Sequence, residues 1–238
     1  MSILCISDIH LSESRPAVTE LFFTFLKREA RRAEALYILG DLFDAWIGDD
    51  DCSQLANDVK NNLSALTDAG TKLFLQHGNR DFLIGQKFLS YIKASLLDDY
   101  HVLDYGNIRI LLTHGDLLCT DDVHYQRFRT KVRKPFNRWC LLRLPLFFRQ
   151  RLADSWRSQS MYANAKKSVD IMDVNLGAVV SVLESNDASI LVHGHTHIPG
   201  RHRVDDSGKE RIVLGEWNSY GSVLSLCEAS WTLSEVTL

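Results

Sequence analysis

Five short apolar runs, each ending in a cluster of polar residues, constrain the fold of this 238-residue chain more than any other feature. The runs are rich in Leu, Ile and Val without polar alternation, which is typical of strands buried on both faces of a sheet. Between them, apolar residues at helical spacing predict helices over 18–35 and 53–70, with Gly70 as the stop of the second. The five runs occupy residues 3–10, 35–44, 72–81, 108–116 and 189–197.

The pattern changes to that of β-hairpins from about residue 201. HRV is followed by the turn DDSGK and by RIVL, and the later segments SVLSLC and WTLSEV both alternate in polarity. Together with the buried strands, this pattern predicts an α/β sandwich with a β-rich C-terminal end. We expect a single domain over residues 1–238, because the length suits one sizeable core.

The segment at about 121–167 departs from this alternation of strands and helices. It holds twelve basic residues against three acidic ones, which gives the segment a net charge of +9. Because the whole chain has a net charge of −3, the residues outside the segment carry −12. It also contains eight aromatic residues, among them Trp139, Phe147 and Phe148. We expect a largely helical insertion that lies over the sheet edge as a lid.

The remaining composition narrows the class of protein. The longest other apolar stretch, at 141–148, is interrupted by Arg143 and Pro145, so we expect no membrane-spanning segment. The N-terminus has no basic region or cleavage site of a signal peptide. Five scattered cysteines without a C-x-x-C pair favour free thiols in a reducing cytoplasm.

The polar clusters carry the candidate chemistry. The carboxyl ends of strands in an α/β sheet open into a crevice where ligands bind. Carboxylates and imidazoles that meet there need a cation, and mixed oxygen and nitrogen ligands suit Mn, Fe, Co or Zn. There are enough of them for two ions. The clusters contain Asp8 and His10; Asp41 and Asp44; Asn79, Arg80 and Asp81; His114 and Asp116; and His193, His195 and His197.

Each cluster taken alone has a purely structural explanation. A single His at a strand end is more often hydrogen-bonded than metal-bound, Asp41 or Asp81 could cap a helix, and the glycine in each cluster could simply form a turn. Five such coincidences favour a shared functional site. The histidines outside this pattern are expected to lie behind the site or on the surface: His77, His101, His124, His193 and His202.

The order of the motifs resembles the signature of the calcineurin-like metallophosphoesterases. The motifs are D-I-H at 8–10, G-D-L-F-D at 40–44, G-N-R-D at 78–81, T-H-G-D at 113–116 and G-H-T-H at 194–197. The resemblance implies a β-sandwich flanked by helices that holds two metal ions. It assigns Asp8, His10, Asp41 and His197 to one ion. Asp41 then bridges to a second ion, which also takes Asn79, His114 and His195.

Arg80 departs from the general family pattern, in which a His stands at this position. An arginine stays protonated and cannot act as a general acid at neutral pH, but it can clamp a phosphate oxygen. This favours a phosphoanhydride, whose departing phosphate needs little protonation. Asp44, Asp81 and Asp116 are expected to orient ligand imidazoles or to shape loops.

The arginine and two stretches of the insertion, at 119–129 and 160–175, resemble the branch that hydrolyses UDP-2,3-diacylglucosamine in lipid A synthesis. Independently, Ser160, Asn164 and Lys167 fall at i, i+4 and i+7, which places them on one face of a helix. Without the motif match, an ordinary solvated helix face explains that trio equally well. The resemblance implies substrate contacts from Asn79, Arg80, Asp122, Ser160, Asn164, Lys167 and His195.

The resemblance thus implies a hydrolase that yields 2,3-diacylglucosamine 1-phosphate and UMP through a hydroxide activated by two metal ions, with Mn as the metal. We expect Arg80, His195 and Asp41 to be catalytic. Since the substrate carries acyl chains, we expect peripheral attachment to the cytoplasmic face of the bacterial inner membrane through the basic, aromatic insertion. We expect the protein to be a monomer. Nucleic acid is not an expected partner.

Two other functions stay open at this point. A nucleotide or nucleic-acid phosphodiesterase could use the same metal site, with the insertion gripping a strand. The acidic remainder of the chain and the Leu and Phe clusters argue against it. A non-catalytic scaffold with a vestigial metal site is the second alternative, although seven candidate ligands are present without a gap.

Overall fold

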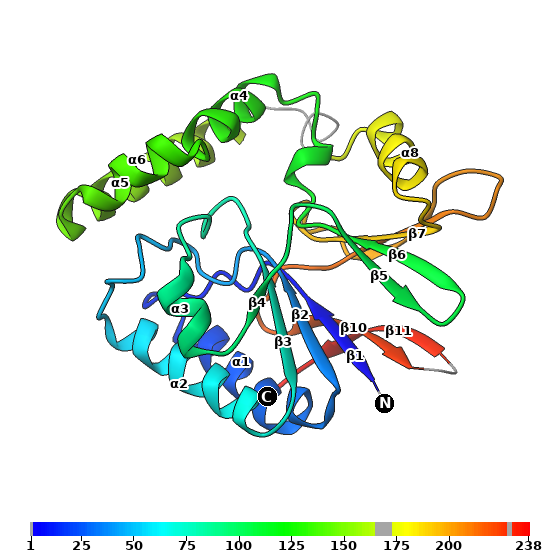
Figure 1. Cartoon of the computed structure of the whole chain (residues 1–238), viewed down its shortest axis with the longest axis horizontal. Helices are drawn as coiled ribbons and strands as arrows, with labels where there is room; N and C mark the ends of the chain where they lie inside the picture. Colours follow the sequence, from blue (N-terminus) through cyan, green and yellow to red (C-terminus); the bar gives the residue numbers. More distant parts are fainter. Residues whose placement is uncertain (1, 165–172, 228–229) are drawn as a thin grey trace.

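The computed structural model describes residues 2–164, 173–227 and 230–238. Two β-sheets are stacked face to face, and helices cover the outer face of each sheet (Figure 1). The layers therefore run helix, sheet, sheet, helix. The α/β sandwich expected from the sequence is confirmed.

The first sheet contains six strands in the order β11-β10-β1-β2-β3-β4. Strands β1 to β4 are parallel to one another, whereas β10 pairs in antiparallel fashion with both β1 and β11. The hairpin predicted near the C-terminus forms β10 and β11. The strands span Ile3–Ile6 (β1), Ala35–Leu39 (β2), Lys72–Gln76 (β3), Ser95–Leu96 (β4), Gly221–Cys227 (β10) and Ser230–Val236 (β11).

The second sheet contains five strands in the order β5-β6-β7-β9-β8. Its centre is parallel, because β6 pairs with β7 and β7 with β9 in the same direction. Both edges are antiparallel. The strands span His101–Tyr105 (β5), Ile108–Leu112 (β6), Ile190–His193 (β7), Gly200–Arg203 (β8) and Glu210–Val213 (β9).

Both faces of the central strands are buried, as their unbroken apolar runs predict. Along β2, Leu36 and Ile38 join the core under the helices, and Tyr37 and Leu39 join the core between the two sheets. The alternation of strand side chains sends successive residues to opposite cores. Because water reaches neither face, no polar residue interrupts the strand.

Helices on the first sheet are α1 (Pro16–Arg28), α2 (Gln54–Asp68) and α3 (Gln86–Tyr91), with a short 3-10 turn at Ala30–Arg32. Helix α8 (Leu176–Ser185) packs on the outer face of the second sheet. Gly70, with φ of +104°, directly follows Ala69, the C-cap residue of α2. A left-handed backbone is accessible to glycine at little cost, so the predicted helix stop is confirmed.

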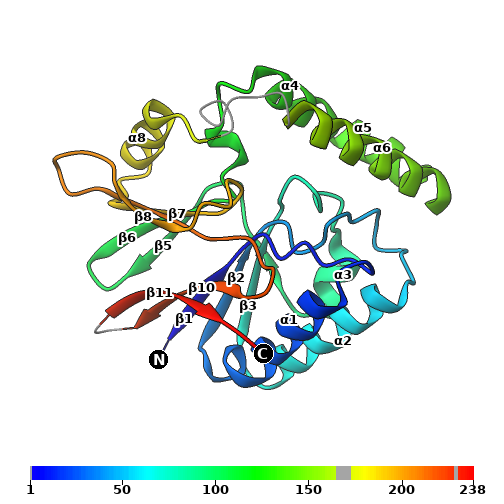
Figure 2. The ribbon, with the colours of Figure 1, turned by 180° about the vertical axis from the view of Figure 1, so that it is seen from behind.

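Three further helices form a separate layer above the carboxyl ends of the central strands, which both views show (Figures 1 and 2). A 3-10 turn at Asp116–Leu118 leads into them, and they span Val123–Val132 (α4), Pro135–Arg143 (α5) and Leu146–Asn164 (α6). We call α4 to α6 the helical layer. In the described residues, the segment at 121–167 is thus helical, while residues from 165 to its end lie outside the described parts.

Prolines set the divisions within this layer. Pro135 occupies the first turn of α5, and Pro145 stands between α5 and α6, where a missing backbone N–H costs least. Among the residues that the structure describes, every helix is too short or too polar to span a bilayer.

Candidate metal and catalytic site

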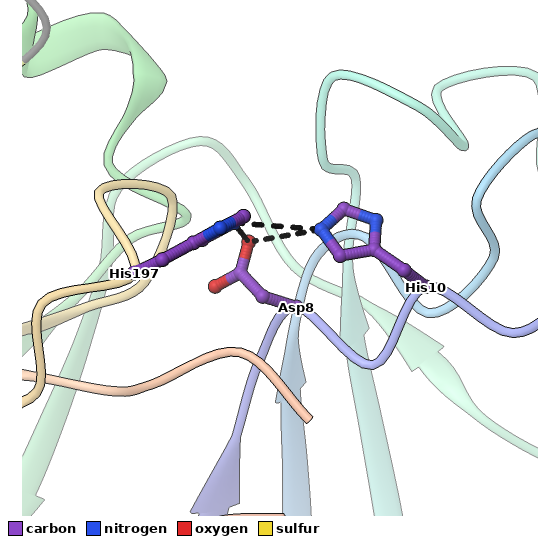
Figure 3. A group of neighbouring side chains, drawn as sticks. All are labelled: Asp8, His10 and His197. Carbon is purple, nitrogen blue, oxygen red and sulfur yellow. Dashed lines mark hydrogen bonds and ion pairs between the residues drawn. The ribbon is translucent and has the colours of Figure 1, made fainter. Parts of the chain in front are cut away.

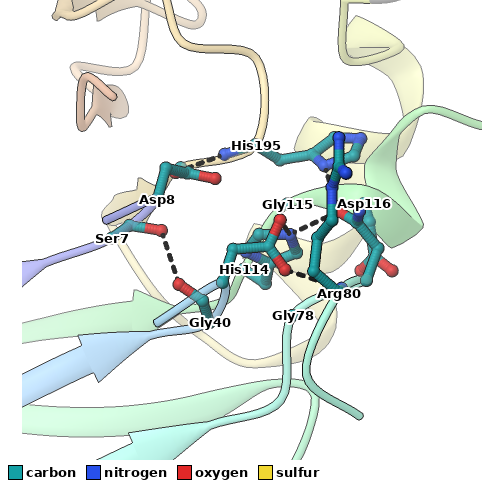
Figure 4. A network of polar contacts seen from close by, with 12 residues as sticks. Ser7, Asp8, Gly40, Gly78, Arg80, His114, Gly115, Asp116 and His195 are labelled. Atoms are coloured by element: carbon teal, nitrogen blue, oxygen red, sulfur yellow. Dashed lines mark hydrogen bonds and ion pairs between the residues drawn. The ribbon is translucent and has the colours of Figure 1, made fainter. Parts of the chain in front are cut away.

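The loops after β1, β2, β3, β6 and β7 converge at the edge of the sandwich that faces the helical layer (Figure 4). Parallel pairing gives β1, β2 and β3 a common direction in one sheet and β6 and β7 a common direction in the other. The polar residues that follow these strands therefore meet. The five clusters that the sequence places at strand ends come together in one site.

The backbone of these loops is unusual. Seven non-glycine residues in the described chain have a positive φ, and five of them are predicted metal ligands. A left-handed backbone costs a residue with a side chain of order 1–3 kcal/mol, and it persists only where the surroundings impose it. These five are Asp8, His10, Asp41, His195 and His197, with φ values of 55°, 52°, 53°, 67° and 57°.

Hydrogen bonds between neighbouring loops impose this conformation. The backbone N–H of Asp8 donates to the carbonyl of Gly40 at 3.2 Å, and that of His10 donates to the carbonyl of Asp41 at 3.0 Å. The Ser7 hydroxyl donates to the Leu39 carbonyl at 2.9 Å. The loops after β1 and β2 are thereby joined along their length, which holds their side chains toward the site.

Two glycines are required here for close approach. A Cβ added to Gly78 would lie 2.1 Å from Oδ1 of Asp41, and one added to Gly194 would lie 2.0 Å from Oδ2 of Asp8. Neither distance is tolerable for a real Cβ. At these positions glycine does more than form a turn, because it lets the backbone of one loop pack directly on the carboxylate of another.

One group of side chains gathers around Asp8 (Figure 3). Nε2 of His197 lies 3.2 Å from Oδ1 of Asp8, and Nε2 of His10 lies 3.9 Å from the same oxygen. The two Nε2 atoms are 3.4 Å apart. A carboxylate oxygen and two imidazole nitrogens thus point at one small volume, which is an arrangement that divalent ions bind.

A second group gathers around Asn79. Its Oδ1 lies 3.0 Å from Nε2 of His114 and 3.0 Å from Nδ1 of His195. Oδ2 of Asp41 lies 3.8 Å from Nε2 of His114 and 3.9 Å from Nε2 of His10. The Asp41 carboxylate therefore stands between the two groups, which is the position that a bridging ligand needs.

The hydrogen bonds behind His114 and His195 help to fix their orientations. Nδ1 of His114 donates to the Leu39 carbonyl at 2.9 Å, so its Nε2 carries the lone pair that faces the site. The backbone N–H of His195 donates to Oδ2 of Asp8 at 2.9 Å. Both contacts involve the main chain, which makes this part of the site an extension of the sheet edge.

Burial shifts the pKa values of three groups at the site, whereas hydrogen bonds to Asp8 and Glu216 outweigh burial at His197 and raise its pKa to about 10. Burial lowers the pKa of His10 to about 4, and burial together with the nearby His114 lowers the pKa of His195 to about 3. Neutral imidazole is the form that binds metals. Burial raises the pKa of Asp41 to about 6, with a further rise from Asp8 that His114 opposes. A buried carboxylate of this kind needs a cation to stay ionised.

The residues present fit two divalent cations. Seven side chains direct carboxylate, amide or imidazole acceptor atoms into a shared volume at the edge of the sheets. The donor set mixes nitrogen and oxygen, which suits Mn, Fe, Co or Zn. The bare imidazole pair at 3.4 Å and the raised pKa of Asp41 are both relieved by positive charge.

Arg80 lies at the rim of this site. Its backbone N–H donates to Oδ1 of Asp41 at 2.8 Å, and its guanidinium Nη1 lies 3.4 Å from Oδ1 of Asp44. The other oxygen of Asp44 lies 2.5 Å from Nη1 of Arg157 in α6. Asp44 therefore holds two guanidinium groups side by side, one from the sheet edge and one from the helical layer.

Asp116 ties α4 to the site. Its Oδ2 accepts from the Tyr125 hydroxyl at 2.6 Å and from Nε of Arg129 at 2.7 Å. Arg133 donates to the Gly78 carbonyl at 2.7 Å, next to Asn79. Asp81 accepts from the backbone N–H groups of Leu42 and Gly78, both at 2.8 Å.

The contacts of Asp44, Asp81 and Asp116 show what these three flanking carboxylates do. Asp81 shapes the loops after β2 and β3, whereas Asp44 and Asp116 connect the site to the helical layer. These carboxylates contact backbone amides, a tyrosine hydroxyl and guanidinium groups. Asp81 and Asp41 follow strands and precede loops, so neither caps a helix.

The predicted substrate residues of the helical layer are less closely defined. Asp122 is the N-cap of α4, where its side chain accepts from the Tyr125 N–H at 3.1 Å. Ser160 is exposed, one turn beyond Arg157 in α6. Asn164 is the last residue of α6, with its side chain outside the described atoms, and Lys167 lies outside the described residues altogether.

Sequence reasoning missed several residues that hold the site together. Glu216, which lies 3.2 Å from Nδ1 of His197, stands in the loop between β9 and β10, where the chain passes from the second sheet to the first. Arg133, Arg149 and Arg157 were counted only as positive charge. A basic residue in a helical segment gives no sign of its partner, and each of these meets a carboxylate or carbonyl at least 55 positions away in sequence.

Comparisons with known proteins agree with this geometry. The sequence profile described as calcineurin-like phosphoesterase matches residues 1–199. The chain is 44% identical to a UDP-2,3-diacylglucosamine hydrolase of Vibrio parahaemolyticus, over 95% of this chain and 94% of that protein. It is 47% and 48% identical to proteins of the same name from Escherichia coli and Enterobacter, over 95% of both chains.

Solved structures share the fold. A dimetal phosphatase from Danio rerio matches with a TM-score of 0.54 at 17% identity, over 99% of this chain and 95% of that one. An archaeal phosphodiesterase matches with a TM-score of 0.51 at 14% identity, over the full length of both chains. At these identities the likeness concerns the arrangement of strands and helices alone.

Proposed function

The chain belongs to the calcineurin-like phosphoesterase family, and from this premise we propose that it hydrolyses the pyrophosphate bond of UDP-2,3-diacylglucosamine. The products are 2,3-diacylglucosamine 1-phosphate and UMP. The reaction is an intermediate step of lipid A biosynthesis. The observation that carries this proposal is the near-full-length identity of 44–48% to UDP-2,3-diacylglucosamine hydrolases. The enzyme is a metal-dependent hydrolase.

Seven side chains would hold two divalent ions, with Mn as the metal we propose. Asp8, His10 and His197 surround one position, and Asn79, His114 and His195 surround the other, with Asp41 between them. When bound, such ions make water acidic enough to supply a nucleophile at neutral pH and neutralise phosphate charge. That role needs no side chain that acts as a strong base.

Arg80 would bind the phosphate under attack. Its guanidinium stays charged throughout the reaction and presents several N–H donors to phosphate oxygens. The contact with Asp44 and the backbone bond to Asp41 keep it at the rim of the metal site before substrate arrives. Donors positioned in advance stabilise the charge that develops in the transition state without reorganising.

Leaving-group chemistry explains why an arginine suffices here. The departing group of a pyrophosphate is a phosphate anion, which needs little protonation, so a general acid contributes little. His195 lies 3.0 Å from Asn79, and its pKa of about 3 keeps it neutral. We assign His195 to the second metal position and to substrate contact rather than to proton donation.

The helical layer would receive the rest of the substrate. Arg157 of α6 contacts Asp44 and so extends the polar rim of the site, and Ser160 lies one turn further along the same helix. Further along the layer, Phe136, Phe147 and Phe148 are exposed. Acyl chains require apolar contact and phosphates require cations, and this layer offers both. We propose that it shelters the acyl chains as a lid.

The same surface supports peripheral attachment to the cytoplasmic face of the inner membrane. Trp139 is exposed beneath the Arg143 guanidinium, 5.0 Å from the ring centroid, and Arg151 lies 4.6 Å from the ring centroid of Phe147. Aromatic rings flanked by arginine are typical of proteins that bind anionic bilayer surfaces. We propose attachment as a monomer, with a lipid-linked sugar nucleotide as substrate and no nucleic acid.

The decisive experiment is incubation of the Mn-loaded full chain with UDP-2,3-diacylglucosamine, followed by identification of both products. We expect UMP and the acylated sugar 1-phosphate. Arg80→Ala should lower kcat by about 10²–10³-fold, the usual cost of one charge-stabilising donor, while bound Mn stays at the wild-type level. The matched control is Arg109→Ala, which removes an exposed arginine paired with Asp104 and Asp187.

Two results would contradict parts of the proposal: the first its substrate, the second the role of Arg80. One is a wild-type chain that leaves this substrate intact but cleaves single-stranded DNA or a cyclic nucleotide, which would favour the phosphodiesterase alternative. The other is an Arg80→Ala variant that turns over at the wild-type rate, which would remove the arginine from the reaction while leaving the substrate assignment in place.

A further inference from the structure

Glu216 lies behind the metal site and outside every motif of the chain. It stands in the loop between β9 and β10, beyond the residues 1–199 that match the family profile. Its Oε2 lies 3.2 Å from Nδ1 of His197, the nitrogen that faces away from Asp8. His197 therefore lies between two carboxylates, with Nε2 toward Asp8 and Nδ1 toward Glu216. When Nε2 binds a metal, Nδ1 must carry the proton, and the Glu216 carboxylate is placed to accept it.

His197 depends on this contact more than the other candidate ligands do. Its side chain is 36% exposed, whereas those of His10 and His114 are 6% and 2% exposed. It also sits on a left-handed backbone at the tip of a loop. Packing therefore does little to prevent its ring from turning over and exchanging its two nitrogens. The Glu216 carboxylate supplies the orientation that packing leaves open.

Arg15 holds Glu216 in place. Its Nη1 lies 3.3 Å from Oε1 of Glu216 and 3.4 Å from the backbone carbonyl of His10. Its Nη2 donates to the Trp217 carbonyl and, at 2.6 Å, to Oδ1 of Asn218. One guanidinium thus links the loop that carries His10 to the loop that carries Glu216. The ring of Trp217 is fully buried, which anchors this second loop in the core.

The other metal position is built differently. The orientation of His114 is fixed by a hydrogen bond to the backbone carbonyl of Leu39, and no side-chain replacement removes that acceptor. His195 is held through its own backbone N–H. A change at Glu216 therefore reaches His197 without reaching His114 or His195. The ligand histidines of the two candidate metal positions are therefore held in different ways: His197 by a side-chain carboxylate, and His114 by a backbone carbonyl.

We propose that Glu216, braced by Arg15, is a positioning residue that fixes the orientation and tautomer of His197. It thereby sets the metal affinity of the position formed by Asp8, His10 and His197. The position formed by Asn79, His114 and His195 is affected much less. This inference rests on the proposed use of two divalent ions.

The test counts bound metal rather than turnover. The Mn-loaded full chain is dialysed against a graded series of a metal chelator, and Mn per chain is measured by atomic absorption. We expect Glu216→Ala to release one of two ions at a free-metal level about 10–100-fold higher than wild type, the usual effect of losing an outer hydrogen-bond partner of a metal-binding His. The second ion should dissociate as in wild type.

Three variants sharpen the result. Glu216→Gln keeps an acceptor for Nδ1 but loses the charge that Arg15 holds, so we expect an intermediate shift. Arg15→Met should shift the same ion by less than Glu216→Ala does. Glu210→Gln is the matched control, because it removes an ion pair of similar exposure between Glu210 of β9 and Arg201 of β8 and should change nothing.

A spectroscopic measurement separates positioning from a structural role. Electron paramagnetic resonance distinguishes a coupled pair of Mn ions from a single ion, and Glu216→Ala should show the single-ion signal at intermediate chelator. Wild-type affinity for both ions in Glu216→Ala would overturn the inference, and so would equal loss of both with a lowered unfolding temperature. In either case, hydrolysis by the wild type would leave the proposed function standing. A wild-type chain that holds no Mn would contradict both.

Discussion

The sheet edge and the helical layer face each other across the site, but they are built in opposite ways. At the sheet edge, Asp8, Asp41 and Asp81 are buried polar groups held by backbone hydrogen bonds. In the helical layer, α5 has no buried residue, and α4 buries only Arg129 and Val132. The first region is part of the core, whereas the second rests on it through side-chain contacts.

Arginines make most of these contacts. Arg129 and Arg133 join α4 to the sheet edge, and Arg157 joins α6 to Asp44. Arg149 is 4% exposed and reaches the Ile47 carbonyl and Asp50 in the loop before α2. Polar attachments of this kind cost less free energy to open than an apolar core does. The proposed metal chemistry thus belongs to a region held within the core, and the proposed recognition of the acylated substrate belongs to a layer held mainly by polar contacts.

The largest expected effect comes from breaking the sheet-edge region at Asp41. Asp41→Ala removes the carboxylate that lies between the two metal positions, so we expect loss of bound Mn together with a fall in kcat greater than the roughly 10²–10³-fold cost of one lost donor. Metal analysis and a turnover assay check this. Asp104→Ala, which changes an exposed carboxylate paired with Arg109, serves as the control. Near-normal turnover of Asp41→Ala in Mn-containing buffer would argue against a two-metal site.

A smaller effect is expected when the helical layer is loosened at Arg149. Arg149→Met keeps the apolar length of the side chain but leaves the Ile47 and Leu144 carbonyls without their donor. This costs about 1–3 kcal/mol, which increases local opening by roughly 5- to 150-fold. Amide hydrogen exchange should therefore rise in α5 and α6 while β1 to β3 stay protected.

The control for this variant is Arg151→Met, an exposed arginine of the same helix that rests on Phe147. It should leave exchange unchanged. If Arg149→Met raised exchange equally in β1 to β3, the layer and the sheet edge would form one cooperative unit, and the contrast drawn between them would be wrong.

The smallest effect is expected at the side of the layer that we propose to face the membrane. Phe148 is 58% exposed, so replacing it by Ser loses part of the roughly 1.5–3 kcal/mol that a buried ring contributes. Sedimentation with anionic vesicles should weaken several-fold and should weaken further as salt increases. Ile108→Ser changes an exposed apolar residue of β6, in the second sheet, and should have no effect. Equal binding of the wild type to neutral and anionic vesicles would count against peripheral attachment.

The contrast between the regions also explains what the sequence could predict. The apolar run that contains Leu36, Tyr37 and Ile38 predicts a buried strand, because burial on both faces excludes polar residues. The polar side chains that follow such a strand lie at its carboxyl end, where ligands bind in α/β sheets. The polar clusters at the strand ends therefore follow from local pattern and strand direction, whereas the choice of seven ligands among them follows from the resemblance to the calcineurin-like metallophosphoesterases. Their spatial convergence needed only the assumption of a parallel sheet.

Contacts between distant loops could not be predicted in this way. Arg15 and Glu216 lie 201 positions apart, and neither stands in a periodic pattern. The pairing of Asp44 with Arg157 depends on where the helical layer rests, which its nearly uniform basic charge does not specify. Such pairs are decided by loop geometry after the strands have assembled. The layer was predicted as a helical, basic segment, but its points of attachment were not.

The left-handed backbone at five candidate ligands has a consequence for how this protein can evolve. Glycine at Asp8 or Asp41 would relax a conformation that costs the folded chain of order 1–3 kcal/mol, and would also remove a buried carboxylate. Selection for stability alone would therefore erode these positions first. Keeping these residues lowers the stability of the fold but preserves the candidate ligands. Stabilising substitutions should therefore be sought in the helical layer or on the sheet surfaces, away from the loops that follow β1, β2 and β7.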